Sequence, residues 1–224
     1  MAKARAEKSF KQIQIFFSRQ DITELIRSMD ETLEVFRKQA WDGLMPVLEV
    51  LESLRFKIQC ALYTDNSIEK NQPLYSFALS PVQAFYYARL LDKAFNDHLK
   101  AGNELPSEHR ERIMLFMQKM NNPIKEAIDE NEYYRLTSIN QYDVSFLYIQ
   151  YLNFLYEDRL QEPSSKKNLA LLIMLCDGAQ GNQSNNRILP YDVFSQRCDT
   201  WMRKHNTDYI CLDEIIADES FSKL

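Results

Sequence analysis

The sequence predicts an all-helical fold, a multi-helix bundle formed by one domain over residues 1–224. Glycine is scarce, with 4 in 224 residues, so tight turns must be few. Apolar residues recur at helical spacing along several segments. Serine, aspartate or proline precedes several of these segments, as is typical of helix starts. A chain of this length that is 45% hydrophobic can bury a substantial core.

The first long helix is expected to begin at Asp21, which has the spacing of a capping box with Glu24. Residues 1–11 are polar and basic and lack the apolar centre of a signal peptide, so they are expected to lead into a helix. Apolar residues at helical spacing predict one helix over 22–36 and a second over 44–58.

Further helices follow along the rest of the chain. Ser80-Pro81-Val82-Gln83 is typical of a helix start, with Ser80 as the cap and Gln83 bonding back to it. The remaining helices are expected over 107–120, from Asn122-Pro123, from a cap at Ser138 and Gln141 through Tyr156, over 169–176, from Pro190 through Trp201 and over 212–216, with a loop over 178–186.

Composition limits the classes of function. The net charge of -5 argues against nucleic acid as the main partner, because phosphate binding needs a basic surface. No segment approaches the ~18 consecutive apolar residues of a membrane span, so no integral membrane segment is expected. The four cysteines contain no Cys-x-x-Cys pair, so we expect reduced thiols and no metal site.

No motif for covalent catalysis or cofactor binding is present in the sequence. His98, His109 and His205 are scattered among charged residues and are expected at the surface. Cys198 and His205 are seven residues apart and could share a helix face. They are a weak candidate for a cysteine–histidine dyad, because such dyads are normally assembled from distant segments. We therefore expect no cofactor and no hydrolase chemistry.

The stretch Trp41-Asp42-Gly43-Leu44-Met45-Pro46-Val47-Leu48 is unusual because it places an acid, a glycine and a proline within an apolar helical pattern. It lies at the junction of two expected helices, where an acid before a proline suits a helix start. The stretch resembles the core helix of the vacuolar-protein-sorting-nine type exchange domain, which carries an Ala-Asp-x-Leu-Leu-Pro-Val-Leu pattern. Ser18-Arg19-Gln20-Asp21-Ile22 is loosely similar to the preceding segment of that family.

This resemblance, over residues 18–90, implies an exchange factor that promotes GDP release from Rab-type small GTPases of the early endosome. Such a protein makes and breaks no covalent bonds. Asp42 would be the catalytic residue, because a carboxylate near the nucleotide repels the β-phosphate and pairs with the GTPase's phosphate-loop lysine. Pro46 would fix the helix that presents it. Residues 18–100 would form the exchange-factor-like core, and residues 107–224 would be supporting helices.

The resemblance also implies further contacts with the GTPase. The family has a Tyr-x-x-Thr element entering a helix, and Tyr75 with Ser80 is the preferred counterpart here, at roughly the right distance along the chain. Tyr134 and Thr137 match the letters better but lie much farther along, so both pairs remain open. The apolar groove implied beside this element is lined in part by Leu44, Val47 and Leu51.

The acidic tail from Asp213 to Leu224 has an apolar residue close to its end. It is similar to C-terminal signals of bacterial effectors exported by type IV secretion. This similarity implies action in the cytoplasm, including that of a host cell. An ordinary exposed terminus is the alternative.

A non-enzymatic helical adaptor or scaffold that binds a partner helix is the alternative function. Met114, Met117 and Met120 would supply an adaptable surface or simply belong to the core. In an adaptor, Asp42 would only begin its own helix. The two functions therefore differ in whether Asp42 acts on a partner. The sequence does not define an oligomeric state.

Overall fold

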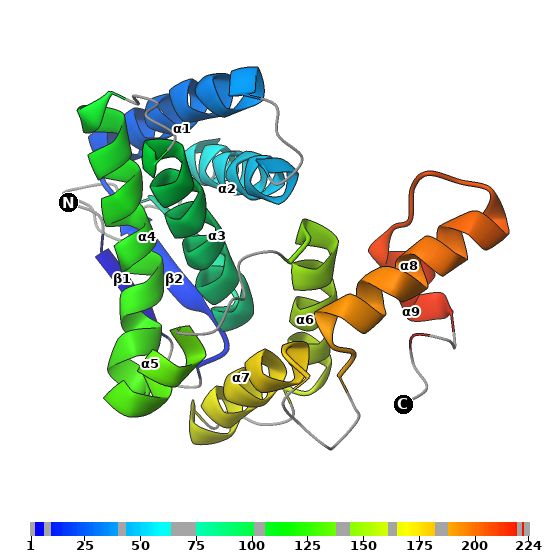
Figure 1. Cartoon of the computed structure of the whole chain (residues 1–224). Helices are drawn as coiled ribbons and strands as arrows, with labels where there is room; N and C mark the ends of the chain where they lie inside the picture. The colour runs from blue at the N-terminus through cyan, green and yellow to red at the C-terminus, as the bar shows by residue number, and fades with distance from the viewer. Residues whose placement is uncertain are drawn as a thin grey trace.

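The computed structural model describes residues 3–6, 10–39, 44–63, 75–100, 106–137, 144–160, 165–181, 188–218 and 221. These residues are mainly helical, which confirms the all-α class, and one small sheet accompanies the helices. Figure 1 shows α1 to α5 gathered around the sheet at one end of the molecule. α6 and α7 lie beside them, and α8 and α9 lie at the end farthest from the sheet. The helices are α1 (Arg19–Gln39), α2 (Met45–Tyr63), α3 (Pro81–Lys100), α4 (Ser107–Ala127), α5 (Glu130–Thr137), α6 (Phe146–Asp158), α7 (Ser165–Ala179), α8 (Tyr191–His205) and α9 (Leu212–Ala217).

Three short strands form an antiparallel sheet in the order β1-β2-β3, which was not predicted. In its register, Ile13 pairs with Leu79 and Phe17 pairs with Tyr75. Alternate side chains of β2 are buried, as expected of a strand with one face on the core. The expectation that residues 1–11 lead into a helix is wrong, because part of this segment pairs with β2. The strands are β1 (Lys3–Ala6), β2 (Ile13–Phe17) and β3 (Tyr75–Leu79).

The cap of α1 is Ser18, not the expected Asp21. The backbone N–H of Asp21 donates to Ser18 Oγ at 3.1 Å, so the helix begins at Arg19. A serine hydroxyl at this position satisfies an amide that has no partner within the helix.

α1 and α2 pack antiparallel to each other. An ion pair of 2.5 Å joins Arg37 to Glu52, and a second joins Arg55 to Asp30. Because α1 ends shortly before Met45 and α2 begins there, the structure confirms the predicted helix junction.

The predicted start of α3 is confirmed in detail. The backbone N–H of Gln83 donates to Ser80 Oγ at 3.1 Å, and the N–H of Ser80 donates to Gln83 Oε1 at 3.3 Å. Pro81 occupies the first helical position, where its missing N–H has no cost.

α4 runs without a break through Pro123, so the expected new helix at Asn122-Pro123 is wrong. Proline lacks the N–H that would bond the carbonyl four residues earlier. Its ring is buried, and packing of this face keeps the helix continuous.

α6 begins later than expected. Its cap is Ser145, whose Oγ accepts from the N–H of Tyr148 at 3.2 Å, whereas Ser138 and Gln141 lie outside the described residues. Tyr148 and Tyr156 are buried and donate their hydroxyls to the carbonyls of Leu189 at 2.6 Å and Phe10 at 2.7 Å. These bonds join α6 to the chain before α8 and to the N-terminal sheet region.

The last three helices agree with the predicted order and are longer than expected. Gly178 belongs to α7 rather than to a loop, and a Cβ there would lie 2.8 Å from Ile188 side-chain atoms, so glycine permits this close approach. Gln180 and Gly181 form a turn after α7, and residues 182–186 of the expected loop lie outside the described residues.

Candidate functional site

The expected catalytic residue, Asp42, lies outside the described residues. Its neighbour Pro46 is half-buried in the first turn of α2, and Met45 beside it is exposed. The structure therefore describes the helix that follows Asp42, but not the carboxylate itself.

The apolar side chains expected to line a groove are part of the core. Leu44, Val47 and Leu51 are buried, so they do not form an open surface beside Pro46. The reason is that this face of α2 packs against α1, β3 and α3.

Tyr75 and Pro46 lie near opposite ends of α1. Tyr75 pairs with Phe17, just before α1 begins, whereas the antiparallel α2 places Pro46 beyond the last turn of α1. The 21 residues of α1 span about 31 Å at a rise of 1.5 Å per residue. Ser80 is buried as the α3 cap. The structure therefore does not bring Tyr75 and Ser80 together with Pro46.

The alternative pair, Tyr134 and Thr137, lies on α5. Tyr134 is exposed, and the Thr137 hydroxyl donates to the Tyr134 carbonyl at 3.1 Å. Figure 1 shows α5 at the end of α4 remote from α2, so this pair is also separated from Pro46.

α2 instead presents an apolar stripe to solvent. Met45, Phe56 and Tyr63 are 57%, 67% and 78% exposed. Cys60 on the same face is also exposed. Residues three and four apart share a helix face, so these side chains form one surface with Glu49 and Glu52 between them. We call this surface the α2 outer face; it consists of Met45, Glu49, Glu52, Phe56, Cys60 and Tyr63.

Acidic groups sit in the middle of the α2 outer face. Partial burial raises the pKa of the Glu49 carboxyl, and the nearby charge of Glu52 raises it further. Glu52 in turn bonds Arg37 of α1. Among the described residues, Glu52 therefore has an ion partner, whereas Glu49 has none.

A second candidate site is a pocket of about 210 Å³ between α3, α4 and α5, which we call the α3–α5 pocket. Tyr133 lines it, and the Tyr133 hydroxyl accepts from Arg89 Nη2 at 2.5 Å and bonds the Asn121 amide. The Arg89 guanidinium lies 5.6 Å from the ring centres of both Phe85 and Tyr133. The pocket is lined by Ala88, Arg89, Asp92, Met114, Met117, Gln118, Asn121, Tyr133 and Thr137.

Two polar atoms beside this pocket are buried without a hydrogen-bond partner, Arg89 Nε and Asn121 Oδ1. Turning the Asn121 amide would exchange its two ends, so in either orientation one end bonds Tyr133 and the other lacks a partner. A buried polar group left unpaired costs about 1–3 kcal/mol. Both atoms are buried, so this unused hydrogen-bonding capacity lies beside the pocket and is not open to it.

His109 is buried, which contradicts its expected place on the surface. Its Nε2 lies 2.5 Å from Glu31 Oε2, and its Nδ1 lies 3.1 Å from Ser28 Oγ. The arrangement resembles a nucleophile, base and acid, but Ser28 is fully buried and its hydroxyl donates to the Glu24 carbonyl at 2.9 Å. The cluster therefore serves the contact between α1 and α4 and offers no accessible nucleophile.

Among the residues that the structure describes, the other histidines and cysteines form no catalytic pair. Burial raises the pKa of Cys198 to about 11, with Asp199 adding to the shift, so its thiolate is disfavoured. His205 is exposed, as expected, and stacks on Trp201 with 4.1 Å between ring centres. The His98 side chain lies outside the described part of the chain.

Among the described residues, no cluster of His, Cys, Asp and Glu side chains could hold a metal ion. In the same part of the chain, no helix combines the length and apolar character needed to cross a membrane. Comparisons with protein families, with curated proteins and with solved structures find no match to this chain. The two candidate sites therefore rest on the chain's own geometry.

The sequence reasoning missed both sites. The signal for the α2 outer face was present, because apolar residues occur on both faces of this helix. The α3–α5 pocket joins residues of three helices, and no spacing within one segment indicates it.

Proposed function

We propose that this protein is a helical interaction domain that docks a partner protein on the α2 outer face. The observation that carries this proposal is the exposure of Met45, Phe56 and Tyr63 on one side of a helix whose opposite side is buried. Large apolar side chains that gather on a surface are typical of interaction sites.

The chemistry of the α2 outer face favours a particular kind of partner. An amphipathic partner helix would bury its apolar residues against Phe56 and Tyr63. Basic side chains on that helix would meet the carboxylates of Glu49 and Glu52, and a cation there would favour the charged form of Glu49. This is the adaptor or scaffold function.

Photo-crosslinking tests the docking proposal. A photoreactive amino acid at position 56 is expected to give a discrete cross-linked product in cells, and Tyr63→Gln is expected to abolish it. The same probe at position 209, where Tyr209 is equally exposed, is the matched control. A product that survives Tyr63→Gln, or that forms equally from position 209, would overturn the proposal.

The second candidate is an exchange factor for Rab-type GTPases of the early endosome. It is supported by the resemblance around Asp42 and Pro46 and by the exposed Met45, which places a contact surface directly after Asp42. A partner that binds the nucleotide-free GTPase best must weaken nucleotide affinity by the same coupling. Because Tyr75 and Ser80 lie elsewhere, the helix junction alone would carry the activity.

Release of a fluorescent GDP analogue from a panel of Rab GTPases tests this second candidate. Acceleration that is lost in Asp42→Ala and in Phe56→Gln would support exchange through the α2 outer face. Binding of a GTPase without acceleration would leave the adaptor function. Absence of acceleration on every early-endosomal member would exclude the exchange factor.

The proposed place of action is the cytoplasm, including that of a host cell reached by type IV secretion. The resemblance of the acidic tail supports this proposal. Phe221 in the tail is buried, with its ring 5.9 Å from that of Phe194 on α8. An export assay with the tail fused to a reporter tests it, and a fusion that is not exported would contradict it.

A further inference from the structure

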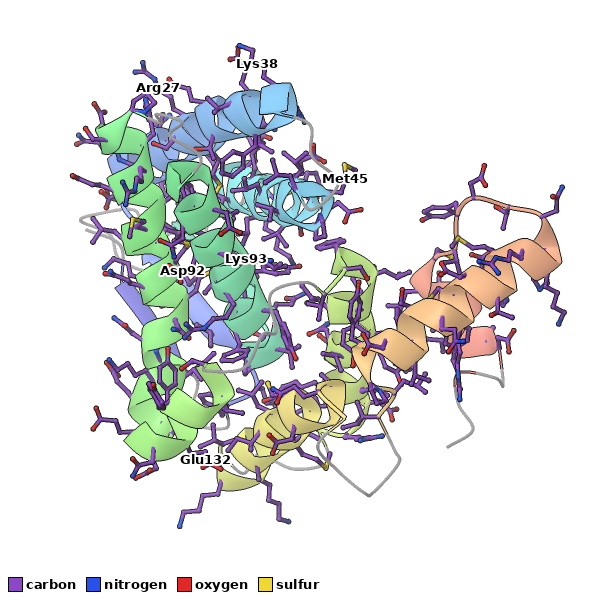
Figure 2. All side chains as sticks on the ribbon, viewed as in Figure 1. Arg27, Lys38, Met45, Asp92, Lys93 and Glu132 are labelled. Atoms are coloured by element: carbon purple, nitrogen blue, oxygen red, sulfur yellow. The ribbon has the colours of Figure 1, made fainter. Side chains whose placement is uncertain are left out.

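The α3–α5 pocket combines charges of both signs on one helix face. Arg89 and Asp92 are three residues apart on α3 and both line the pocket. Figure 2 shows Asp92 on the side of α3 that faces α4, with Lys93 on the other side. In the described part of the chain no ion pair joins Arg89 to Asp92, and Asp92 has no hydrogen-bond partner.

Arg89 is held ready for an anionic group. Its guanidinium lies over two aromatic rings and donates to Tyr133 through Nη2, while its Nε is buried without a partner. Because Nη2 is engaged by Tyr133 and Nε is buried, this guanidinium would bind a carboxylate through Nη1 and through its charge. Its position in the pocket is therefore set before a ligand arrives.

The opposite charge of Asp92 restricts which anion can enter. A simple anion would meet the Asp92 carboxylate, and a simple cation would meet the Arg89 guanidinium. A molecule that carries a carboxylate and an ammonium group a few bonds apart would satisfy both. Met114 and Met117 supply the apolar wall, and methionine adapts to small side chains of different shape.

We propose that the α3–α5 pocket binds a small zwitterion of the class of free α-amino acids with a short apolar side chain. The volume of about 210 Å³ suits a small molecule, since pockets for drug-sized ligands begin at about 300 Å³. Arg89 binds the carboxylate, Asp92 binds the ammonium group, and Gln118 supplies a further polar contact.

Calorimetric titration of the full chain with glycine, L-alanine, L-valine and L-methionine tests the proposal. Saturable binding of at least one of these is expected, together with a rise in melting temperature. Acetate and ethylamine each carry one of the two charges and are expected to bind at least about tenfold more weakly. No binding of any of the four amino acids, or equal binding of acetate, would overturn the proposal.

Asp92→Asn is the decisive variant, because Asp92 takes part in no hydrogen bond or ion pair with the described part of the chain. It is expected to lower the affinity for the bound amino acid by about tenfold or more and to leave acetate binding undiminished. Asp158→Asn, outside the pocket, changes the net charge equally and is the matched control. Circular dichroism verifies that both variants fold, and unchanged amino-acid affinity in Asp92→Asn would contradict the assignment.

Discussion

His109 Nε2 lies 2.5 Å from Glu31 Oε2 across the contact between α4 and α1. The opposite ring nitrogen lies 3.1 Å from Ser28 Oγ, and Arg112 of α4 bonds Glu24 of α1 at 3.0 Å nearby. This polar cluster crosses an otherwise apolar helix contact. It favours one position of α4 along α1, because His109 and Arg112, one turn apart on α4, bond Glu31, Ser28 and Glu24 of α1 at the same time.

Replacing His109 should weaken this contact. His109→Ala leaves the buried Ser28 hydroxyl and the Glu31 carboxylate without their ring partner, so the free energy of unfolding is expected to fall by about 2 kcal/mol. Urea denaturation followed by circular dichroism measures the change. His205→Ala, at an exposed position, is the control and should have a smaller effect. Equal midpoints for His109→Ala and the parent protein would contradict a structural role.

Substitutions at Ser80 test its role as the cap of α3. Ser80→Ala removes the acceptor for the Gln83 N–H and is expected to cost about 1 kcal/mol of stability. Ser80→Asp retains an acceptor and should recover most of this loss. Thermal unfolding of the two variants gives the answer. Equal stability of Ser80→Ala and the parent would show that the cap contributes nothing.

The two faces of α2 should respond differently to substitution. Leu54→Ala removes a fully buried side chain and is expected to cost about 2–5 kcal/mol. Phe56→Gln alters the α2 outer face and should change stability by less than about 0.5 kcal/mol. Chemical denaturation of both variants measures the contrast. A large loss in Phe56→Gln would mean that Phe56 is packed rather than exposed.

The raised pKa of Cys198 predicts a loss of stability at alkaline pH. Its folded-state pKa of about 11 lies above the ordinary thiol value of 9.0, because burial favours the neutral thiol. Its contribution is complete below pH 9.0 and is lost as the pH rises toward about 11, because the unfolded chain releases the proton first. The stability difference between the parent and Cys198→Ala should therefore shrink over this range in urea titrations. A constant difference would contradict the raised pKa.

Helix starts were the most predictable features, because they depend on neighbouring residues. Ser80 with Gln83 and the junction near Pro46 needed no knowledge of distant contacts. The α1 cap was misplaced because Asp21 also has the chemistry of a cap, and only the geometry selects Ser18. Pro123 misled for a different reason, since packing of a buried ring keeps α4 continuous.

The sheet and the sites depend on contacts between distant segments. Ile13 and Phe17 show the alternation of a strand, but their partners in β3 lie far along the chain. The burial of His109 follows from its pairing with α1, and its charged sequence neighbours gave no sign of it. For the same reason the separation of Tyr75 from Pro46 emerges only when α1 is placed between them.

The hydrogen bond from Tyr156 to the Phe10 carbonyl joins residues 146 positions apart. During synthesis on the ribosome, Phe10 emerges long before its partner does. The segment between β1 and β2 therefore lacks this bond until α6 has left the exit tunnel. A fragment that ends before α6 would remain in this unfinished condition, with the Phe10 carbonyl lacking its donor. The contact between α6 and the N-terminal sheet region is thus a late step in folding during synthesis.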